Sequence, residues 1–379
     1  MTDMATALHT PKGKAARDKT EKYYLASQWQ LIWWRFTRHK LAMIAAPVLI
    51  ILYLFAIFPE FIAPYGPTTR FPDHLNAPPV KIHLIDSVGH LRWPFVYKRT
   101  QVLNIETFKR EYTEDTSKAY PIKLFTRGEP YKLWGIIPGS LHLFGAGEVS
   151  LLVFGSDRLG YDLCSRIIYG ARISLTIGLV GVLISFLLGI IIGGISGFYG
   201  GMVDDIIQRV IDFINSIPTL PLWMALAAAV PRDWPVAKTY FAITLVLSII
   251  GWCGLARVVR GKLLALREEE FALAARASGA SEWRIITKHL LPSFFSYLIV
   301  SITLSVPNMI IGETTLSFLG LGMRPPAVSW GVLLQDAQQL VYVAQQPWLL
   351  IPCIFVIVTV LMYNFLGDGL RDAADPYAR

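Results

Sequence analysis

Long apolar segments restrict this chain to a membrane-spanning fold more strongly than any other feature of its sequence. A helix needs about 20 mainly apolar residues to cross a hydrocarbon core of ~30 Å. Backbone polar groups inside lipid must also be hydrogen-bonded within the protein. We therefore predict an all-α polytopic membrane protein with six transmembrane helices, at residues 41–58, 173–198, 206–230, 241–258, 294–318 and 348–366.

The composition agrees with a membrane protein. Hydrophobic residues make up 54% of the 379 residues and charged residues only 16%, whereas soluble domains contain about a quarter charged residues. The formal net charge is +8. In so apolar a chain, we attribute this charge to basic segments that face anionic lipid rather than to nucleic-acid binding.

The distribution of Lys and Arg predicts the orientation of the spans. The first 40 residues carry eight of them and the segment 257–288 carries seven, whereas 231–239 and 322–347 together carry three. Positive residues concentrate in short loops on the cytoplasmic side. Both termini and the 257–288 segment are therefore predicted to be cytoplasmic.

This orientation divides the chain into five parts. They are a cytoplasmic tail with an elbow helix (1–40), the first transmembrane helix (41–58) and an extracytoplasmic insertion (59–171). A five-helix core that includes the loop 259–292 follows (172–367), and a cytoplasmic C-terminal tail ends the chain (368–379).

The segment 23–36, "YYLASQWQLIWWRF", is predicted to be the elbow helix, lying in the membrane interface. Its apolar residues recur at helical spacing and its tryptophans suit the headgroup region; the residues that repeat are Leu25, Trp29, Ile32, Trp33 and Phe36. The alternative is a continuous extension of the first span.

The insertion between the first two spans is predicted to be small and β-rich. Runs such as "VKIHLI", "PFVYKR" and "YKLWGII" are rich in β-branched and aromatic residues, and Pro and Gly separate them. The four histidines of the insertion, His74, His83, His90 and His142, do not have the spacing of metal ligands, and neither do the three cysteines of the chain, Cys164, Cys253 and Cys353. No metal site is therefore expected.

Small residues recur at every fourth position of the second predicted span. In lipid, helices associate through close backbone approach, and rows of small residues permit it. We predict that this face packs against another helix; its members are Gly181, Ser185, Gly189, Gly193 and Gly197.

A polar stripe runs along the start of the third predicted span, formed by Asp205, Gln208, Arg209, Asp212, Asn215 and Ser216. An ionised side chain at the bilayer centre costs at least ~2.5 kcal/mol, so the stripe must face protein or water. One interpretation is an interfacial helix start in which Asp205 pairs with Arg209. The other is that Asp212 and Asn215 reach a translocation path. Pro218 and Pro221 are expected to interrupt the helix.

Glu313 is the second carboxylate expected inside the membrane region. It lies near the outer end of the fifth predicted span, about a turn and a half beyond Asn308. Two roles remain open for it: a structural salt bridge or hydrogen bond, and contact with a substrate. The candidate residues of a translocation path are thus Asp212, Asn215, Asn308 and Glu313.

The loop between the fourth and fifth spans is predicted to be a helix–turn–helix. Residues 263–277 are helix formers, Gly279 suits the helix end, and Ser281 suits the start of a second short helix that Pro292 closes. Small residues keep the turn thin, which suits insertion into a partner's groove. Spans on both sides make insertion into the DNA major groove implausible.

The stretch "AARASGASEWRIITKHLLP" resembles the EAA loop of ABC importer permeases. Ala274, Ala275, Gly279, Leu291 and Pro292 fit that motif, and Leu273 and His289 depart from it as the dipeptide/oligopeptide permease branch does. Further blocks resemble the second membrane subunit of this branch: "FGSDRLGYDLCSRIIYGARISL", "GFYGGMVDDIIQRVIDFINSIPTL", "TLSFLGLGMRPPAVSWGVLL" and "NFLGDGLRDAADP". The resemblance covers residues 24–60 and 154–379, while the insertion 66–150 is less typical.

The resemblance implies a permease subunit in a bacterial inner membrane, forming half of a translocation path with a second homologous permease. Two ABC ATPase subunits would use ATP and Mg, and an extracytoplasmic binding protein would deliver di- or oligopeptides, opines, oligosaccharides or nickel complexes. This chain would bind no cofactor and catalyse no reaction. ATPase coupling would fall to Ala274, Ala275, Arg276, Ser278, Gly279, Ala280, Ser281, Leu291 and Pro292.

Two other classes of function can be weighed against this one. The sequence contains no G-x-x-x-x-G-K-[ST] phosphate loop, so the energy source is either another polypeptide or an ion gradient. An ion-coupled secondary transporter could use Asp212 and Glu313, but it would not need the basic loop and no inverted repeat is evident. Motifs of intramembrane enzymes are lacking.

Overall fold

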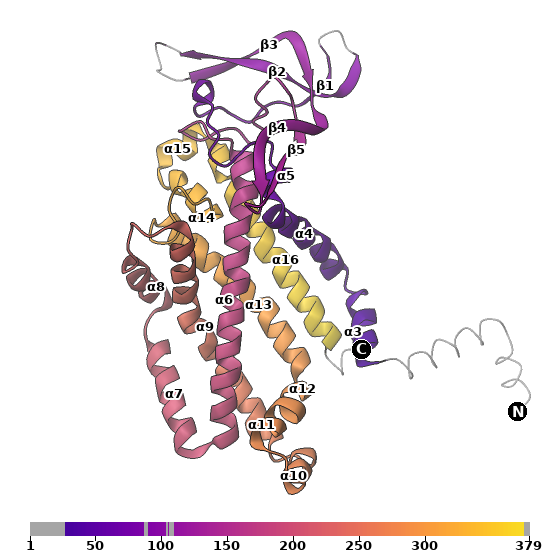
Figure 1. The fold of residues 1–379 in the computed structure, drawn as a ribbon, viewed down its shortest axis with the longest axis vertical. Coiled ribbons are helices and arrows are strands. Elements are labelled where there is room, and N and C mark those ends of the chain that lie inside the picture. Colours follow the sequence, from indigo (N-terminus) through magenta and orange to yellow (C-terminus); the bar gives the residue numbers. More distant parts are fainter. Residues whose placement is uncertain (1–26, 87–89, 104, 106–109, 375–379) are drawn as a thin grey trace, which may run out of the picture.

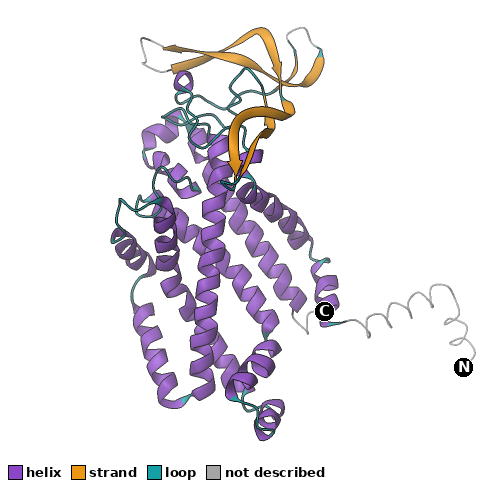
Figure 2. Cartoon of the chain, viewed as in Figure 1, coloured by secondary structure: helices purple, strands orange, loops and turns teal. Residues whose placement is uncertain are grey.

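The computed structural model describes residues 27–86, 90–103, 105 and 110–374. A bundle of long helices fills most of the molecule, and all the strands gather at one end of it (Figures 1 and 2). At the opposite end the chain makes a group of short helices around α10. The described part of the chain is thus elongated, with strands at one end and short helices at the other.

Five described helices are long and apolar enough to cross a membrane: α4 (Lys40–Ile57), α6 (Leu163–Tyr199), α9 (Val236–Leu266), α13 (Phe295–Phe318) and α16 (Ile351–Ala374), the last preceded by the short η4 (Pro347–Leu350). A sixth candidate is the pair α7 (Gly201–Ser216) and α8 (Thr219–Ala228), which is bent by 83°. Ile217 adopts extended backbone at this break, as the residue before a proline usually does.

Several helices extend beyond the apolar segments. The helix α6 begins at Leu163 rather than near 173, α9 is longer than 241–258 at both ends, and α16 continues to Ala374 through most of the predicted tail 368–379. Apolar content marks only the part of a helix that suits lipid, whereas caps set where it begins. Asp162, for example, starts α6 by accepting a hydrogen bond from the Ser165 N–H at 2.7 Å.

The helix α3 (Gln28–Phe36) is separate from α4. Ser27 and Gln30 form a capping box, with Ser27 Oγ accepting from the Gln30 N–H and Gln30 Oε1 accepting from the Ser27 N–H. His39 then caps α4 by accepting the Ala42 N–H at 3.1 Å. A continuous extension of the first span is therefore wrong. Residues 23–26 of the predicted elbow, and most of the N-terminal tail, lie outside the described residues.

The insertion contains two antiparallel sheets. The first has the order β1-β2-β3, and the second pairs β4 with β5. The short helices α5 (Pro59–Ile62) and η1 (Pro72–His74) precede the strands, which are β1 (His83–Ile85), β2 (Leu91–Leu103), β3 (Arg110–Pro121), β4 (Lys123–Leu133) and β5 (Ile137–Gly145). A small apolar cluster around Val80, Val96 and Leu151 lies beneath them.

Between α13 and α16 the chain forms α14 (Trp330–Leu333), η3 (Leu334–Gln338) and α15 (Leu340–Gln345) at the strand end of the bundle. Trp330 is fully buried in the main core, and its Nε1 donates to the carbonyl of Ile167 in α6 at 3.0 Å. This segment thereby closes one end of the bundle.

The row of small residues on α6 faces α9. A Cβ atom added at Gly197 would lie 2.7 Å from the Arg260 carbonyl oxygen, and one at Gly193 would overlap the backbone of Ala256. Nearer the strand end, Ser185 Oγ of α6 donates to the carbonyl of Ser248 in α9. The Ser248 hydroxyl in turn donates to the carbonyl of Gly181. The two helices therefore touch backbone to backbone, the approach that small residues allow in lipid.

Replacing Gly193 with Ala should separate α6 from α9. We expect the Gly193→Ala variant to lose about 1–3 kcal/mol of stability, the usual cost of overpacking, and to melt at a lower temperature in detergent. Gly254→Ala is the matched control, because an added Cβ at Gly254 meets no atom within 4 Å and Ala favours the helix. Equal melting temperatures for the two variants would contradict this account of the interface.

Candidate functional site

The group of short helices lies at the end of the bundle away from the strands (Figure 1). After α9 the chain forms α10 (Glu270–Ala277), a turn, α11 (Glu282–Arg284), the π-helical η2 (Ile285–Leu290) and α12 (Leu291–Ser293). We call residues 270–293 the end loop. It contains every residue that the sequence assigned to ATPase coupling.

The turn of the end loop depends on Gly279. Its φ is +77°, a left-handed conformation in which glycine carries no Cβ penalty. The Gly279 N–H donates to the carbonyl of Arg276 at 3.0 Å, and the Ala280 N–H donates to that of Ala275 at 3.1 Å, so the last carbonyls of α10 are satisfied. A Cβ atom at Gly279 would meet nothing within 4 Å. The turn is therefore both defined and open.

Apolar side chains anchor the base of the end loop. Ala272, Ile285 and Leu290 are buried in one cluster with Phe198 of α6 and Leu263 of α9. The cluster therefore joins the loop to two long helices of the bundle. Burial of this kind contributes roughly 25 cal/mol per Å².

Polar contacts strengthen the same anchor. Arg267, at the end of α9, donates from Nη1 to the carbonyl of Phe198 in α6 at 3.0 Å. Arg276 of the end loop places its guanidinium over the Phe198 ring at 5.7 Å. A displacement of the end loop would consequently act on α6 and α9.

The outer surface of the end loop is accessible. Among the predicted coupling residues, Ala275, Ala280 and Leu291 are half-buried, and the others are exposed: Ala274, Arg276, Ser278, Gly279, Ser281 and Pro292. Phe271 and Trp283, which were not among the predicted coupling residues, are also exposed, Trp283 by 71%. They lie outside the motif residues, and only their aromatic character beside a predicted turn could have indicated them.

Three details of the end loop differ from expectation. The chain breaks between α9 and α10, so residues 263–277 are not one helix. Ser281 has the extended backbone of an N-cap, but its side chain makes no capping hydrogen bond. Pro292 lies in the first turn of α12, where its missing N–H is not needed, and the chain turns at Phe294 instead.

Asp204 forms the main ion pair between α7 and α9. Both of its oxygens accept from the guanidinium of Arg260, and Oδ1 also accepts from Ser196 Oγ. Its side chain is buried. The alternative in which Asp205 pairs with Arg209 is wrong: both residues are exposed, and no ion pair joins them in the described chain. The predicted stripe contained Asp205 instead of its neighbour Asp204. Adjacent residues point about 100° apart around a helix, so a stripe displaced by one residue selects the wrong side chain.

Asp212 makes a second and very different pair. Its Oδ1 accepts from Arg257 Nη2 of α9, but its side chain is 60% exposed. Asn215 and Ser216, further along α7, are exposed as well. The C-terminal part of the predicted polar stripe therefore lies on the surface of this chain.

Glu313 is fully buried and bound by hydroxyl groups. Its oxygens accept from Ser174 Oγ of α6 at 3.0 Å and from Ser317 Oγ at 2.7 Å. Ser174 Oγ in turn accepts a hydrogen bond from the Trp330 N–H, and Ser317 Oγ accepts one from the Met323 N–H. The carboxyl group thus joins α6, α13 and the start of α14, as a structural hydrogen-bonding group does.

Asn308 is exposed and borders a small groove between α6, α9 and α13, with Ser185, Ser301 and Ser305. The structure does not bring the four predicted path residues together. Asp212 pairs with Arg257, Asn215 is exposed on α7, Asn308 borders the groove, and Glu313 is enclosed.

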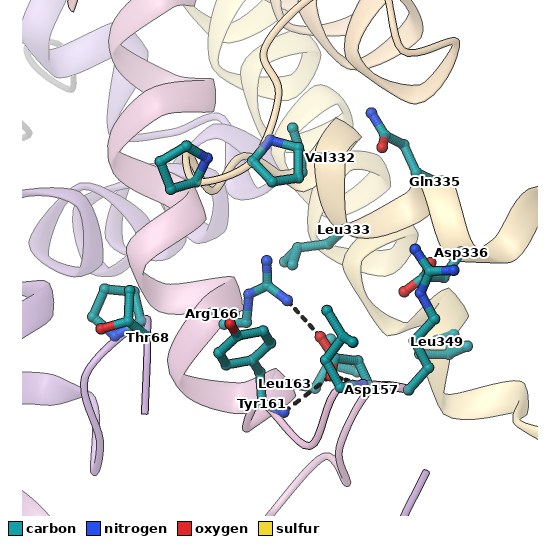
Figure 3. Close-up of a pocket in the computed structure, with 15 residues that line it drawn as sticks. Thr68, Asp157, Tyr161, Leu163, Arg166, Val332, Leu333, Gln335, Asp336 and Leu349 are labelled. Atoms are coloured by element: carbon teal, nitrogen blue, oxygen red, sulfur yellow. Dashed lines mark hydrogen bonds and ion pairs between the residues drawn. The ribbon is translucent and has the colours of Figure 1, made fainter. Parts of the chain in front are cut away.

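A polar pocket of about 140 Å³ lies at the strand end of α6 (Figure 3). Asp157 accepts the N–H groups of Leu159 and Tyr161 at 2.9 Å and also binds the Arg166 guanidinium, which lies over the Tyr161 ring. Across the pocket, Arg158 pairs with Asp336 at 3.1 Å. The two carboxylates balance the two guanidinium groups, so the pocket has no net excess of charge.

Asp162, next to this pocket, is buried at the start of α6. Burial raises the pKa of its carboxyl group to about 7, against the lowering effect of hydrogen bonds from Ser165. No group of His, Cys, Asp and Glu residues in the described ranges could hold a metal ion, and the three cysteines are free.

The two ion pairs between α7 and α9 allow a matched test. We expect Asp204→Ala to cost about 3 kcal/mol, because it leaves Arg260 without its buried partner. Asp212→Ala should cost less than about 1 kcal/mol, because that pair is exposed. Thermal melting of the two purified variants would measure the difference. Similar losses would show that burial does not decide the strength of these pairs.

Comparison with known proteins connects this geometry to a family. Residues 149–379 match the model of the binding-protein-dependent transport system inner membrane component, and residues 27–79 match the N-terminal TM domain of oligopeptide transport permease C. The first of these matches covers the bundle from the strand end of α6 to the C-terminus and includes the end loop.

Named relatives agree with the family match. The dipeptide transport system permease protein DppC of Lactococcus lactis subsp. cremoris (strain MG1363) is 32% identical over 376 residues, covering 97% of this chain and 96% of the relative. The alignment therefore spans the β-rich insertion. DppC of Bacillus subtilis (strain 168) is 42% identical over 226 residues, 60% of this chain and 69% of the relative. OppC of Escherichia coli (strain K12), an oligopeptide transport system permease protein, is 40% identical over 227 residues, which cover 60% of this chain and 72% of the relative. This chain belongs to the family of binding-protein-dependent transport system inner membrane components.

Proposed function

We propose that this chain is a permease subunit of an ATP-driven, binding-protein-dependent ABC importer for dipeptides or oligopeptides. The named relatives support the substrate class. The single observation that carries the mechanism is the end loop, whose accessible turn stands on a buried apolar base shared with α6 and α9. Opines and oligosaccharides remain alternative cargoes.

The end loop would be the attachment site of an ATPase subunit. Two such subunits would bind and hydrolyse ATP with Mg, and this chain would bind no cofactor itself. Closure of the ATPase pair would push the turn at residues 278–281. Packed helices transmit such a movement because close-packed cores do not deform continuously. The force would pass through Ile285 and Leu290 to α6, α9 and α13.

The membrane arrangement follows from the same proposal. The end loop and both termini would face the cytoplasm of a bacterium, α3 would lie in the inner leaflet interface, and the strands would be extracytoplasmic. A second, homologous permease would complete the translocation path. The exposed side of α7, with Asp212 and Asn215, offers polar groups to such a path, and a binding protein would deliver the substrate at the strand end.

Glu313 argues against the alternative of an ion-coupled transporter. Its carboxyl group is 0% exposed and bound to two serine hydroxyls, and Asp212 is paired with Arg257 on a different pair of helices. The two carboxylates therefore have no shared site at which a coupling ion could bind.

Reconstitution of the assembled transporter in liposomes tests the proposal. Uptake of a labelled dipeptide should require ATP, the ATPase subunits and the binding protein together. Uptake by this chain alone, driven by a pH gradient, would contradict it and favour the ion-coupled alternative.

A substitution at Trp283 tests the end loop directly. Because this side chain is exposed and buried aromatic anchors dominate binding energy at interfaces, Trp283→Ser should reduce ATP-dependent uptake about tenfold, equivalent to about 1.4 kcal/mol. The melting temperature of the subunit should not change. Trp93→Ser on β2 is the matched control, since Trp93 is also an exposed tryptophan. Normal uptake with Trp283→Ser would exclude this surface as the coupling site.

A further inference from the structure

The β4–β5 hairpin bends back so that its tip lies beside the end of α4 (Figure 1). Trp134 Nε1 in the tip donates to the carbonyl of Ile57, the last residue of α4, at 2.8 Å. The Trp134 ring also lies 5.6 Å from that of Phe58, and Phe125 of β4 lies 6.3 Å from Phe61 of α5. The tip is therefore held at the level where the apolar span ends.

The side chains at this tip are apolar and uncovered. Ile136 is 79% exposed, and Trp134 and Ile137 are each at least half exposed, as is Phe125 near the start of β4. Such a group would be costly in water and is typical of a surface that meets another molecule or a membrane. Lys132 is exposed next to it, and a lysine in this place can extend its amine toward lipid phosphate.

The backbone holds two of these aromatic residues in an unusual conformation. Trp134 has a φ of 52° and Phe125 a φ of 54°, in the left-handed region that bulky residues rarely adopt. Glycine would fit both positions with less strain. Strain that is retained in a structure often accompanies a functional requirement, and here it directs two aromatic rings toward the end of a span.

The tip continues an exposed apolar surface of α4. Ile50, Leu54 and Ile57 are exposed at helical spacing on this helix, which is apolar enough to cross a membrane. The stripe ends at the residue that Trp134 contacts. Tryptophan is enriched at both membrane interfaces, where its indole meets the headgroups.

We propose that the β4–β5 tip is a membrane anchor inserted in the leaflet at the C-terminal end of α4, which is the outer leaflet in the topology proposed above. Phospholipid acyl chains would cover Ile136 and Ile137, and the Trp134 indole would lie among the headgroups. The anchor would fix the position of the β-rich insertion relative to the bilayer. The proposed anchor rests on the proposed function only in taking α4 to be a membrane span. If the tip proved not to insert, the assignment of the chain as an importer subunit would be unchanged.

Spin labels at single cysteines test this anchor in the assembled transporter, reconstituted in nanodiscs of phosphatidylethanolamine and phosphatidylglycerol. Labels would be placed by Ile136→Cys and, as a second tip site, Ile137→Cys, in a background where the three native cysteines are replaced. Ile105→Cys is the control, because Ile105 is similarly exposed, at 83%, in the connection between β2 and β3. Relaxation by oxygen, which concentrates in lipid, is compared with relaxation by a water-soluble nickel chelate.

We expect the labels at 136 and 137 to respond several-fold more to oxygen than to the nickel chelate, and the label at 105 to show the reverse. A tip label that responds like the one at 105 would place the tip in water and overturn the proposal. Tip labels shielded from both reagents would also overturn it, because they would show that a protein partner covers the tip.

Discussion

Backbone contact between α6 and α9 is the constraint on which the rest of the structure depends. Gly193 and Gly197 let the two helices approach until their backbones touch, and the Asp204–Arg260 pair attaches α7 to the same helices. Below this contact, Phe198 and Leu263 provide the surface on which the end loop packs. A bulkier side chain in the glycine row would therefore displace the base of the end loop as well as the interface itself.

This arrangement explains how a loop can be both accessible and mechanically connected. The turn at Gly279 meets no neighbouring atom where a side chain would be, yet Ile285 and Leu290 are buried a few residues later. Buried apolar contacts resist displacement, whereas an exposed turn is free to bind. At the other end of the bundle, Glu313 and its serine partners join α6, α13 and α14, so the long helices are linked at both ends.

Much of the fold could be predicted from sequence because hydropathy and left-handed turns are local properties. Apolar segments indicated the long helices, and the glycine at 279 indicated the turn. The ends of helices could not be predicted in this way, since α6 and α9 continue beyond their apolar parts. Asp204 was missed because helical periodicity identifies a face only when its orientation toward a neighbour is known. The position of Trp134 against Ile57 likewise depends on tertiary structure, although the strands themselves follow from local patterns.

We propose that the end loop is the surface on which a nucleotide-hydrolysing subunit docks. Replacing Trp283 with a photoreactive phenylalanine analogue in the assembled transporter would measure this contact directly. We expect a crosslinked product with the ATPase subunit from position 283, and none from the exposed Leu340 in α15 at the strand end. A crosslink from position 283 to lipid or to the binding protein, with no ATPase product, would contradict it.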